Sequence, residues 1–150
     1  MENYTLTPAS GLLSAPSVID QPFRPIGLAT VRLTVGPTAT TAGSMPVALA
    51  SVIPVGWATS YRIRVSSSST SPVAFILTTD NTKTAVFPTA FTATGSGGTR
   101  GDKVLDAGAV EVFGLTALQQ NALAAGTLYI SAVTPAGGSA DITVTPGVGA

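Results

Sequence analysis

The chain has 150 residues, with seven basic and seven acidic side chains, no histidine, no cysteine, 16 glycines and 11 prolines. Only 9% of its residues are charged, against roughly a quarter in an ordinary soluble domain. This composition excludes disulfide frameworks, thiolate metal sites and any mechanism that needs a histidine base. A chain of this length buries about 68–70% of its unfolded surface, so we expect one domain whose core needs neither disulfide nor metal.

The charges and the apolar stretches exclude two classes of partner. The basic residues are spread along the chain, so there is no basic block that would neutralise a run of phosphates. The most apolar stretch, residues 112–133, carries Gln119, Gln120 and Asn121 near its middle and does not suit a membrane span. The first residues lack the basic and apolar regions of a secretory signal. We expect neither nucleic acid nor membrane as a partner.

Residues 1–29 differ in pattern from the rest of the chain. They contain Pro8, Pro16, Pro22 and Pro25 among large apolar residues that keep no helical or strand period. Proline fixes φ and favours extended neighbours, so we predict an extended N-terminal arm that lies on its own domain or on a neighbouring subunit; a disordered terminus is the alternative. The candidate contact residues of the arm are Leu12, Leu13, Ile19, Phe23, Arg24 and Ile26.

From residue 30 onward, short alternating runs rich in β-branched residues are separated by turn residues. In the first of them, Val31, Leu33 and Val35 fall on one face and Arg32 on the other. The predicted strands span 30–35, 47–53, 61–65, 73–79, 84–87, 110–113, 127–133 and 141–145. Many short strands at this spacing indicate an all-β fold, a β-sandwich or jelly-roll-like barrel of about eight short antiparallel strands, with residues 30–150 as a single domain.

One short helix is predicted over residues 117–125. Thr116 and Gln119 have the spacing of a capping box, and Gly126 stands where a C-terminal cap belongs. Two further segments, the serine-rich 66–71 and the glycine-rich 94–101, are predicted to be exposed hairpin connections.

The carboxylates Asp102, Asp106 and Glu111 form the one acidic cluster of the sequence. Such a cluster could supply part of a calcium site, or two of its members could cleave a glycosidic bond. The flanking Lys103 and Gly108 suit an ordinary polar turn before a strand, which we favour. Serine and threonine are abundant, but no histidine is available to activate one, and no G-x-S-x-G elbow occurs. We therefore expect no enzyme and no cofactor.

Trp57 is the single tryptophan and follows Gly56 in a stretch typical of a loop. Its ring suits either packing in a core or interface, which we favour, or the stacking of a sugar. It joins the arm residues as a candidate contact.

Residues 60–150 resemble a group of small all-β proteins encoded beside the major capsid protein in tailed bacteriophages. Two motifs carry the resemblance most clearly: Ala-Gly-Ala-Val-Glu-Val followed by an aromatic residue at 107–113, and the closing Thr-Pro-Gly-Val-Gly at 145–149. The other matching segments are the strand entering a serine turn at 61–66, the Pro-Val-Ala-Phe entry at 71–76 and the strand at 127–133. The arm and the segment around Gln119 depart from the pattern.

This resemblance implies a structural virion protein of the capsid decoration or cement type. Such a protein would be made in the host cytoplasm and located on the capsid surface. It would bind the outer face of the shell of major capsid protein, bridge neighbouring subunits and form a homo-oligomer, a trimer or a dimer as capsid symmetry dictates. The alternative from another class is a receptor- or carbohydrate-binding β-module on a phage fibre or head surface. A glycan-cleaving enzyme that uses Asp102 or Glu111 is a third, less favoured hypothesis.

Overall fold

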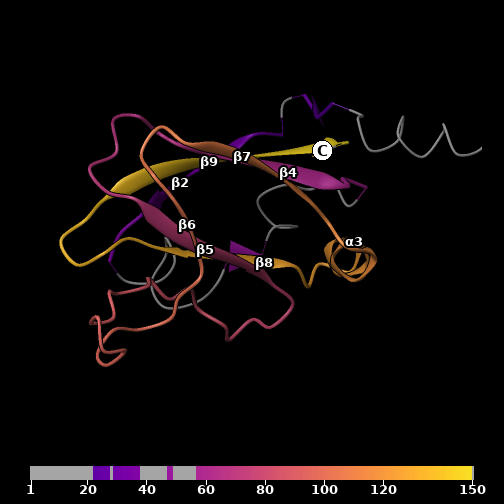
Figure 1. Ribbon diagram of the computed structural model, residues 1–150. Helices are drawn as coiled ribbons and strands as arrows, with labels where there is room; N and C mark the ends of the chain where they lie inside the picture. The colour runs from indigo at the N-terminus through magenta and orange to yellow at the C-terminus, as the bar shows by residue number, and fades with distance from the viewer. Residues whose placement is uncertain (1–21, 28, 38–46, 49–56, 150) are drawn as a thin grey trace, which may run out of the picture.

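The protein is a two-layered β-sandwich with one short helix, as a computed structural model shows (Figure 1). The structure describes residues 22–27, 29–37, 47–48 and 57–149. Within these residues the strands form two antiparallel sheets, one of five strands and one of four. The predicted all-β fold class is therefore confirmed.

The larger sheet, which we call sheet A, is built around its last strand. The strands are β1 (Arg24–Pro25), β2 (Val31–Val35), β4 (Ser60–Val65), β7 (Val110–Gly114) and β9 (Ala140–Val148). On one side β9 pairs with β4, which pairs in turn with β7. On its other side β9 pairs with β2 near its beginning and with β1 near its end. Three strands, β1, β2 and β4, thus pair with β9.

The smaller sheet, sheet B, has the order β3-β8-β5-β6. Its strands are β3 (Val47–Ala48), β5 (Val73–Thr78), β6 (Lys103–Leu105) and β8 (Tyr129–Val133). Figure 1 shows this sheet beneath sheet A, with the helix α3 (Ala117–Ala124) beside one end of the sandwich. The alternating pattern of the strands directs one face of each sheet inward, so that the core lies between the two layers. Its largest fully buried side chains are Tyr61, Ile63, Leu123, Leu128, Ile130 and Ile142.

The helix begins with the predicted capping box. The Thr116 hydroxyl accepts a hydrogen bond from the backbone N–H of Gln119 at 3.2 Å, and Gln119 Oε1 accepts one from the Thr116 N–H at 3.0 Å. The helix stops at Ala125, and Gly126 follows with a φ of 77°, a conformation that glycine adopts without strain. Leu123 faces the core with 1% of its surface exposed, so the helix closes that end of the sandwich.

The prediction for residues 84–87 is wrong, because the structure has no strand there. The segment does pack on the outside of sheet B, where Ala85 contacts a small cluster with Ala74 and Val133. Its backbone donors are bound by side chains: the N–H of Ala85 donates to Ser131 Oγ at 2.9 Å, and the N–H of Val86 donates to Asp102 Oδ2 at 2.8 Å. These bonds take the place of a strand ladder.

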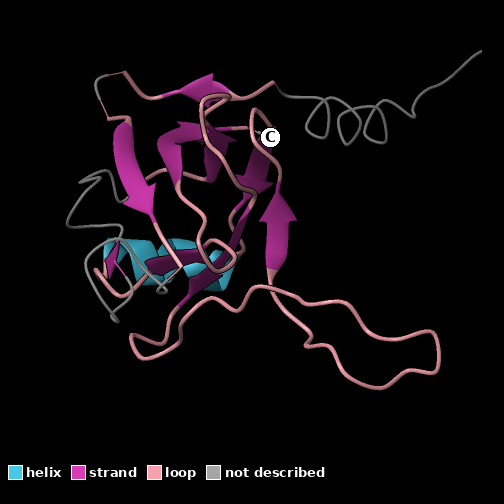
Figure 2. Ribbon diagram, turned by 90° about the vertical axis from the view of Figure 1, so that its left-hand side faces the viewer, coloured by secondary structure: helices cyan, strands magenta, loops and turns pink. Residues whose placement is uncertain are grey.

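Two other strand predictions need adjustment. Sheet B contains β6 (Lys103–Leu105), which the sequence analysis placed in a turn. Of the predicted strand 47–53, only Val47–Ala48 falls within the described residues, as β3. The glycine-rich segment 94–101 is exposed, as predicted, and belongs to a long loop that projects from the sandwich (Figure 2). Among the described residues, no helix is both long and apolar enough to cross a membrane.

Candidate binding surfaces

The described part of the predicted arm is fastened to the end of β9. Arg24 and Pro25 pair with Val148 and Gly147, and the N–H of Ile26 donates to the Pro146 carbonyl at 2.9 Å. Ile26 packs against the main core. The sequence places residues 1–21, with the candidate contacts Leu12, Leu13 and Ile19, ahead of this point, and they lie outside the described residues.

Phe23, in the described part of the arm, packs against sheet A. The Arg62 guanidinium carbon lies 5.3 Å from the centre of the Phe23 ring, a distance at which cation and ring attract each other. The ring also lies over Gly147, where a Cβ atom would overlap it. Glycine at this position therefore lets the aromatic side chain rest directly on the backbone of β9. Arg24 remains exposed.

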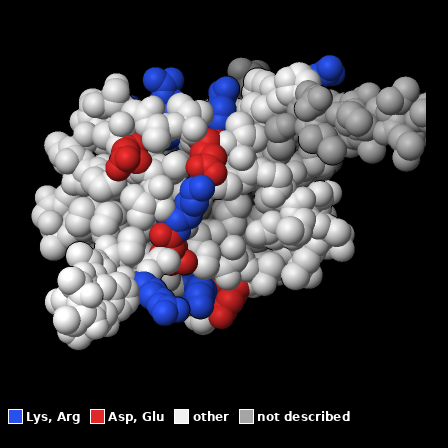
Figure 3. Space-filling view, in the orientation of Figure 1, with Lys and Arg blue, Asp and Glu red and all other residues white. Residues whose placement is uncertain are grey.

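Trp57 lies at a turn just before β4, with 64% of its surface exposed. Trp57 is therefore a surface residue, and it does not pack in the core of its own domain. The loop residue Phe91, 49% exposed, is a second exposed aromatic. Figure 3 shows most of the visible charged side chains in a column down one face, with largely uncharged surface on both sides of it.

A polar hollow of about 360 Å³ lies on the outer face of sheet A, where the sequence analysis predicted no site. The strand register places Arg32 of β2 and Arg64 of β4 on either side of Thr143 of β9. Three serines and one carboxylate complete its walls, so that the lining consists of Arg32, Arg64, Ser66, Ser67, Ser68, Asp141 and Thr143. Every side chain in this set can form a hydrogen bond.

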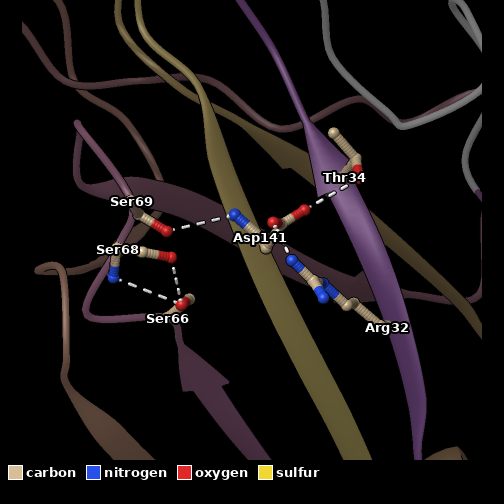
Figure 4. Close-up of polar contacts among 6 residues, drawn as sticks. All are labelled: Arg32, Thr34, Ser66, Ser68, Ser69 and Asp141. Carbon is tan, nitrogen blue, oxygen red and sulfur yellow. Dashed lines mark hydrogen bonds and ion pairs between the residues drawn. The ribbon is translucent and has the colours of Figure 1, made fainter.

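Asp141 is the central acceptor of the hollow (Figure 4). Arg32 donates to its Oδ2, and the Thr34 hydroxyl donates to its Oδ1 at 2.8 Å. These bonds, that from Arg32 foremost, hold the pKa of the Asp141 carboxyl below its ordinary value and raise the pKa of Arg32. The carboxylate is therefore ionised at neutral pH.

The serine loop is fixed to the same residue. The N–H of Ser66 donates to the Asp141 carbonyl at 2.8 Å, and the N–H of Asp141 donates to Ser69 Oγ at 3.1 Å. A tight turn joins the two ends, with the Ser69 N–H donating to the Ser66 carbonyl at 3.0 Å. The hydroxyls of Ser66 and Ser68 lie 2.8 Å apart within this turn (Figure 4). The wall of the hollow is thus positioned by backbone contacts.

The acidic cluster predicted at Asp102, Asp106 and Glu111 is divided among structural roles. Asp102 accepts from the backbone of Val86, and Glu111 pairs with Lys103 at 2.7 Å. Within the described ranges, no three acidic residues lie close enough together to hold a metal ion.

A scan against models of protein families, a search of curated proteins and a search of solved structures each find no significant match.

Proposed function

We propose that the protein is a capsid decoration protein of a tailed bacteriophage, which binds the outer surface of the shell and links neighbouring subunits of the major capsid protein. One observation carries the proposal most directly: the arm is anchored on β9, the strand with which β1, β2 and β4 pair. A contact made by residues ahead of Pro22 therefore acts on the whole of sheet A.

The sequence of the arm supports a role in binding to a neighbour. Leu12, Leu13 and Ile19 stand between prolines, and prolines lower the entropy that an extended segment loses on docking. Twenty-one residues precede Pro22, and a fully extended chain of that length reaches up to about 70 Å. The arm is long enough to reach an adjacent subunit.

The exposed surface also suits a protein that becomes covered in an assembly. Trp57 is the most exposed aromatic ring among the described residues, and large exposed aromatics are common at the centres of interfaces. A partner that binds only the assembled shell stabilises it by mass action, so the proposed mechanism requires buried area and symmetry and no catalytic group.

The test is the stability of shells with and without the protein. Empty shells of the phage's own major capsid protein are heated alone, with the full chain and with a variant that lacks residues 1–21 but keeps β1. We expect the full chain to raise the temperature at which shells rupture and the truncated chain to have a weaker effect, while both chains unfold at the same temperature when free.

Trp57→Ala supplies a second measurement, because this side chain makes no large contribution to the core. We expect it to weaken binding to shells without lowering the unfolding temperature of the free protein. Shells that rupture at the same temperature with and without the full chain would contradict the proposal. If host adsorption were then lost in particles that lack the protein, the receptor-binding alternative would replace it.

A further inference from the structure

We propose that the polar hollow on sheet A binds one acidic sugar residue, a pyranose that carries a single carboxylate. The hollow lies toward the beginning of β9, away from the arm, and the inference does not depend on the proposed function. Its volume of about 360 Å³ lies at the lower end of the range of about 300–1,000 Å³ for small-molecule sites. This size suits a sugar unit better than a long peptide.

The charges of the hollow match a single negative charge. Arg32 and Arg64 contribute two positive charges and Asp141 one negative charge, which leaves one positive charge in excess. Arg32 is bonded to Asp141, whereas Arg64 has no ion-pair partner among the described residues. A planar guanidinium binds a carboxylate with two parallel hydrogen bonds. Arg64 is therefore the group that receives the carboxylate of the sugar.

Asp141 opposes anions of higher charge. A phosphate monoester carries close to two negative charges at neutral pH, and the ionised carboxylate on the same wall would repel the second of them. A sugar carboxylate, with one charge, meets the guanidinium of Arg64 and leaves the Arg32–Asp141 pair intact. The balance of charge thus favours a carboxylate over a phosphate.

The remaining lining groups suit the hydroxyls of a sugar ring. A carboxylate offers about four acceptor positions, and Asp141 uses one for Arg32 and one for Thr34. Thr143 and the serine turn add hydroxyls that both donate and accept. Sugar hydroxyls also donate and accept, so each can be paired at such a wall.

A neutral sugar should bind much more weakly than an acidic one. Among the described residues no aromatic ring lines the hollow, so the affinity must come from charge and hydrogen bonds and not from stacking on a ring. The wall is already ordered, because both ends of the serine turn are bonded to the backbone of Asp141. Binding to an ordered wall costs less entropy than binding to a mobile loop.

The experiment is a titration of the full ¹⁵N-labelled chain followed by amide NMR. The probes are methyl glucuronide and its neutral counterpart, methyl glucoside. We expect the glucuronide to give saturable shifts at residues 66–68 and 141–143, with a Kd in the millimolar range, and the glucoside to bind at least about tenfold more weakly. Acetate and inorganic phosphate, added separately, should also bind at least about tenfold more weakly than the glucuronide.

The matched variants are Arg64→Gln and Arg62→Gln, which remove the same charge from the same face of β4. We expect Arg64→Gln to weaken glucuronide binding by about tenfold and Arg62→Gln to change it by less than about twofold. Ser67→Ala, an exposed change within the turn, should weaken binding by about two- to fivefold and provides a test should Arg64→Gln fail to fold.

Three results would overturn the inference. The first is an absence of saturable shifts up to about 50 mM glucuronide, well above the millimolar range expected. The second is equal binding of the glucuronide and either the glucoside, acetate or phosphate. The third is an equal loss of affinity in Arg64→Gln and Arg62→Gln, which would indicate general electrostatic attraction instead of a site.

Discussion

The two ends of β9 differ in what covers them. From Ala140 to Val144 buried and half-buried residues alternate, as in a strand with one face open to solvent, whereas every residue from Val144 to Gly147 is buried. The outer face of the latter end is covered by the Phe23 ring and the backbone of Arg24. There the hydroxyls of Thr30 and Thr145 are also hydrogen-bonded to each other. At the other end the outer face forms the polar hollow. The arm therefore covers one end of β9 and leaves the outer face of the other end exposed to solvent.

One strand, β9, thus contributes both to the attachment of the arm and to the polar hollow. Val148 follows Asp141 by seven positions, which corresponds to about 23 Å along a strand. The strands β1 and β2 both run antiparallel to β9 and pair with it at its two ends. The same edge of β9 thus holds the arm at one end and positions Arg32 at the other. If the two surfaces are independent, a substitution at the arm end of β9 should leave the hollow intact, and a substitution in the hollow should leave the arm attached.

The largest effect is expected for Ile142→Ala, at the hollow end. Ile142 is fully buried, and truncation of a buried isoleucine costs about 2–5 kcal/mol. The neighbouring Asp141 and Thr143 would lose their support, so the free energy of unfolding and sugar binding should both fall. Urea denaturation measures the first. Val148→Ala, at a half-buried position of the arm end, should cost clearly less; an equal cost would contradict the comparison.

Gly147→Val should have the next largest effect and should act on the arm end. An added Cβ would overlap both the Phe23 ring and the Arg24 carbonyl oxygen, and overpacking of this kind costs about 1–3 kcal/mol. We expect β1 to detach, which hydrogen exchange at the Ile26 amide would report as lost protection. Gly36→Ala is the control, because an added Cβ there meets no atom of the described residues within 4 Å. Retained protection at Ile26 would show that the arm is not held by this contact.

A smaller effect is expected for Tyr61→Phe, in the core beneath the arm end. The Tyr61 hydroxyl is buried without a hydrogen-bond partner among the described residues, and burial raises its pKa to about 12. The neutral phenol is favoured in the folded state, so stability is retained below the unfolded pKa near 10 and falls as the pH rises from there toward 12. Removal of the hydroxyl should raise stability by about 1 kcal/mol and reduce the alkaline loss. An alkaline loss of the same size in the Phe variant would contradict this role of the buried hydroxyl.

The smallest effect on stability is expected for Asp141→Asn. Because the folded pKa of Asp141 is lowered by Arg32 and Thr34, its contribution is present above the ordinary carboxyl pKa and is lost as the pH falls through the folded value. The wild-type protein should therefore lose stability on acidification by more than the Asn variant does, as thermal unfolding between pH 7 and pH 2 would reveal. An equal loss of stability on acidification in the wild-type protein and in the Asn variant would contradict this role of Asp141. The Ile26 amide at the arm end should remain protected from hydrogen exchange in both proteins.

The sequence predicts the fold better than it predicts the hollow. Alternation identified most strands of both sheets, and the spacing of Thr116, Gln119 and Gly126 identified the helix with its capping box. These signals are local, because they depend on residues within one element. The wrong strand at 84–87 had the right composition and does pack on sheet B. Side chains of Ser131 and Asp102, distant in the sequence, bind its backbone donors, and a local pattern cannot show that.

The hollow depends on strand register. The sequence placed Arg32 on the face of its strand opposite the core and predicted a loop for the serine run after residue 65. It did not show that β9 lies between β2 and β4, nor that Thr143 faces both arginines. Arg32 and its partner Thr143 are more than 100 positions apart in the sequence, so only the folded sheet brings them together. The arm contacts, in contrast, were proposed from composition alone.

The position of β9 also sets the order in which sheet A can form. The strands β1, β2 and β4 precede it in the chain, yet each of them pairs with β9. During synthesis these strands must wait, with unpaired edges, until residues 140–148 have been made. Pairing over such sequence separations is slow, and waiting strands are open to association with other chains. The low charge of the chain does little to oppose this, so rapid folding after synthesis matters more for this protein than for one whose central strand comes first.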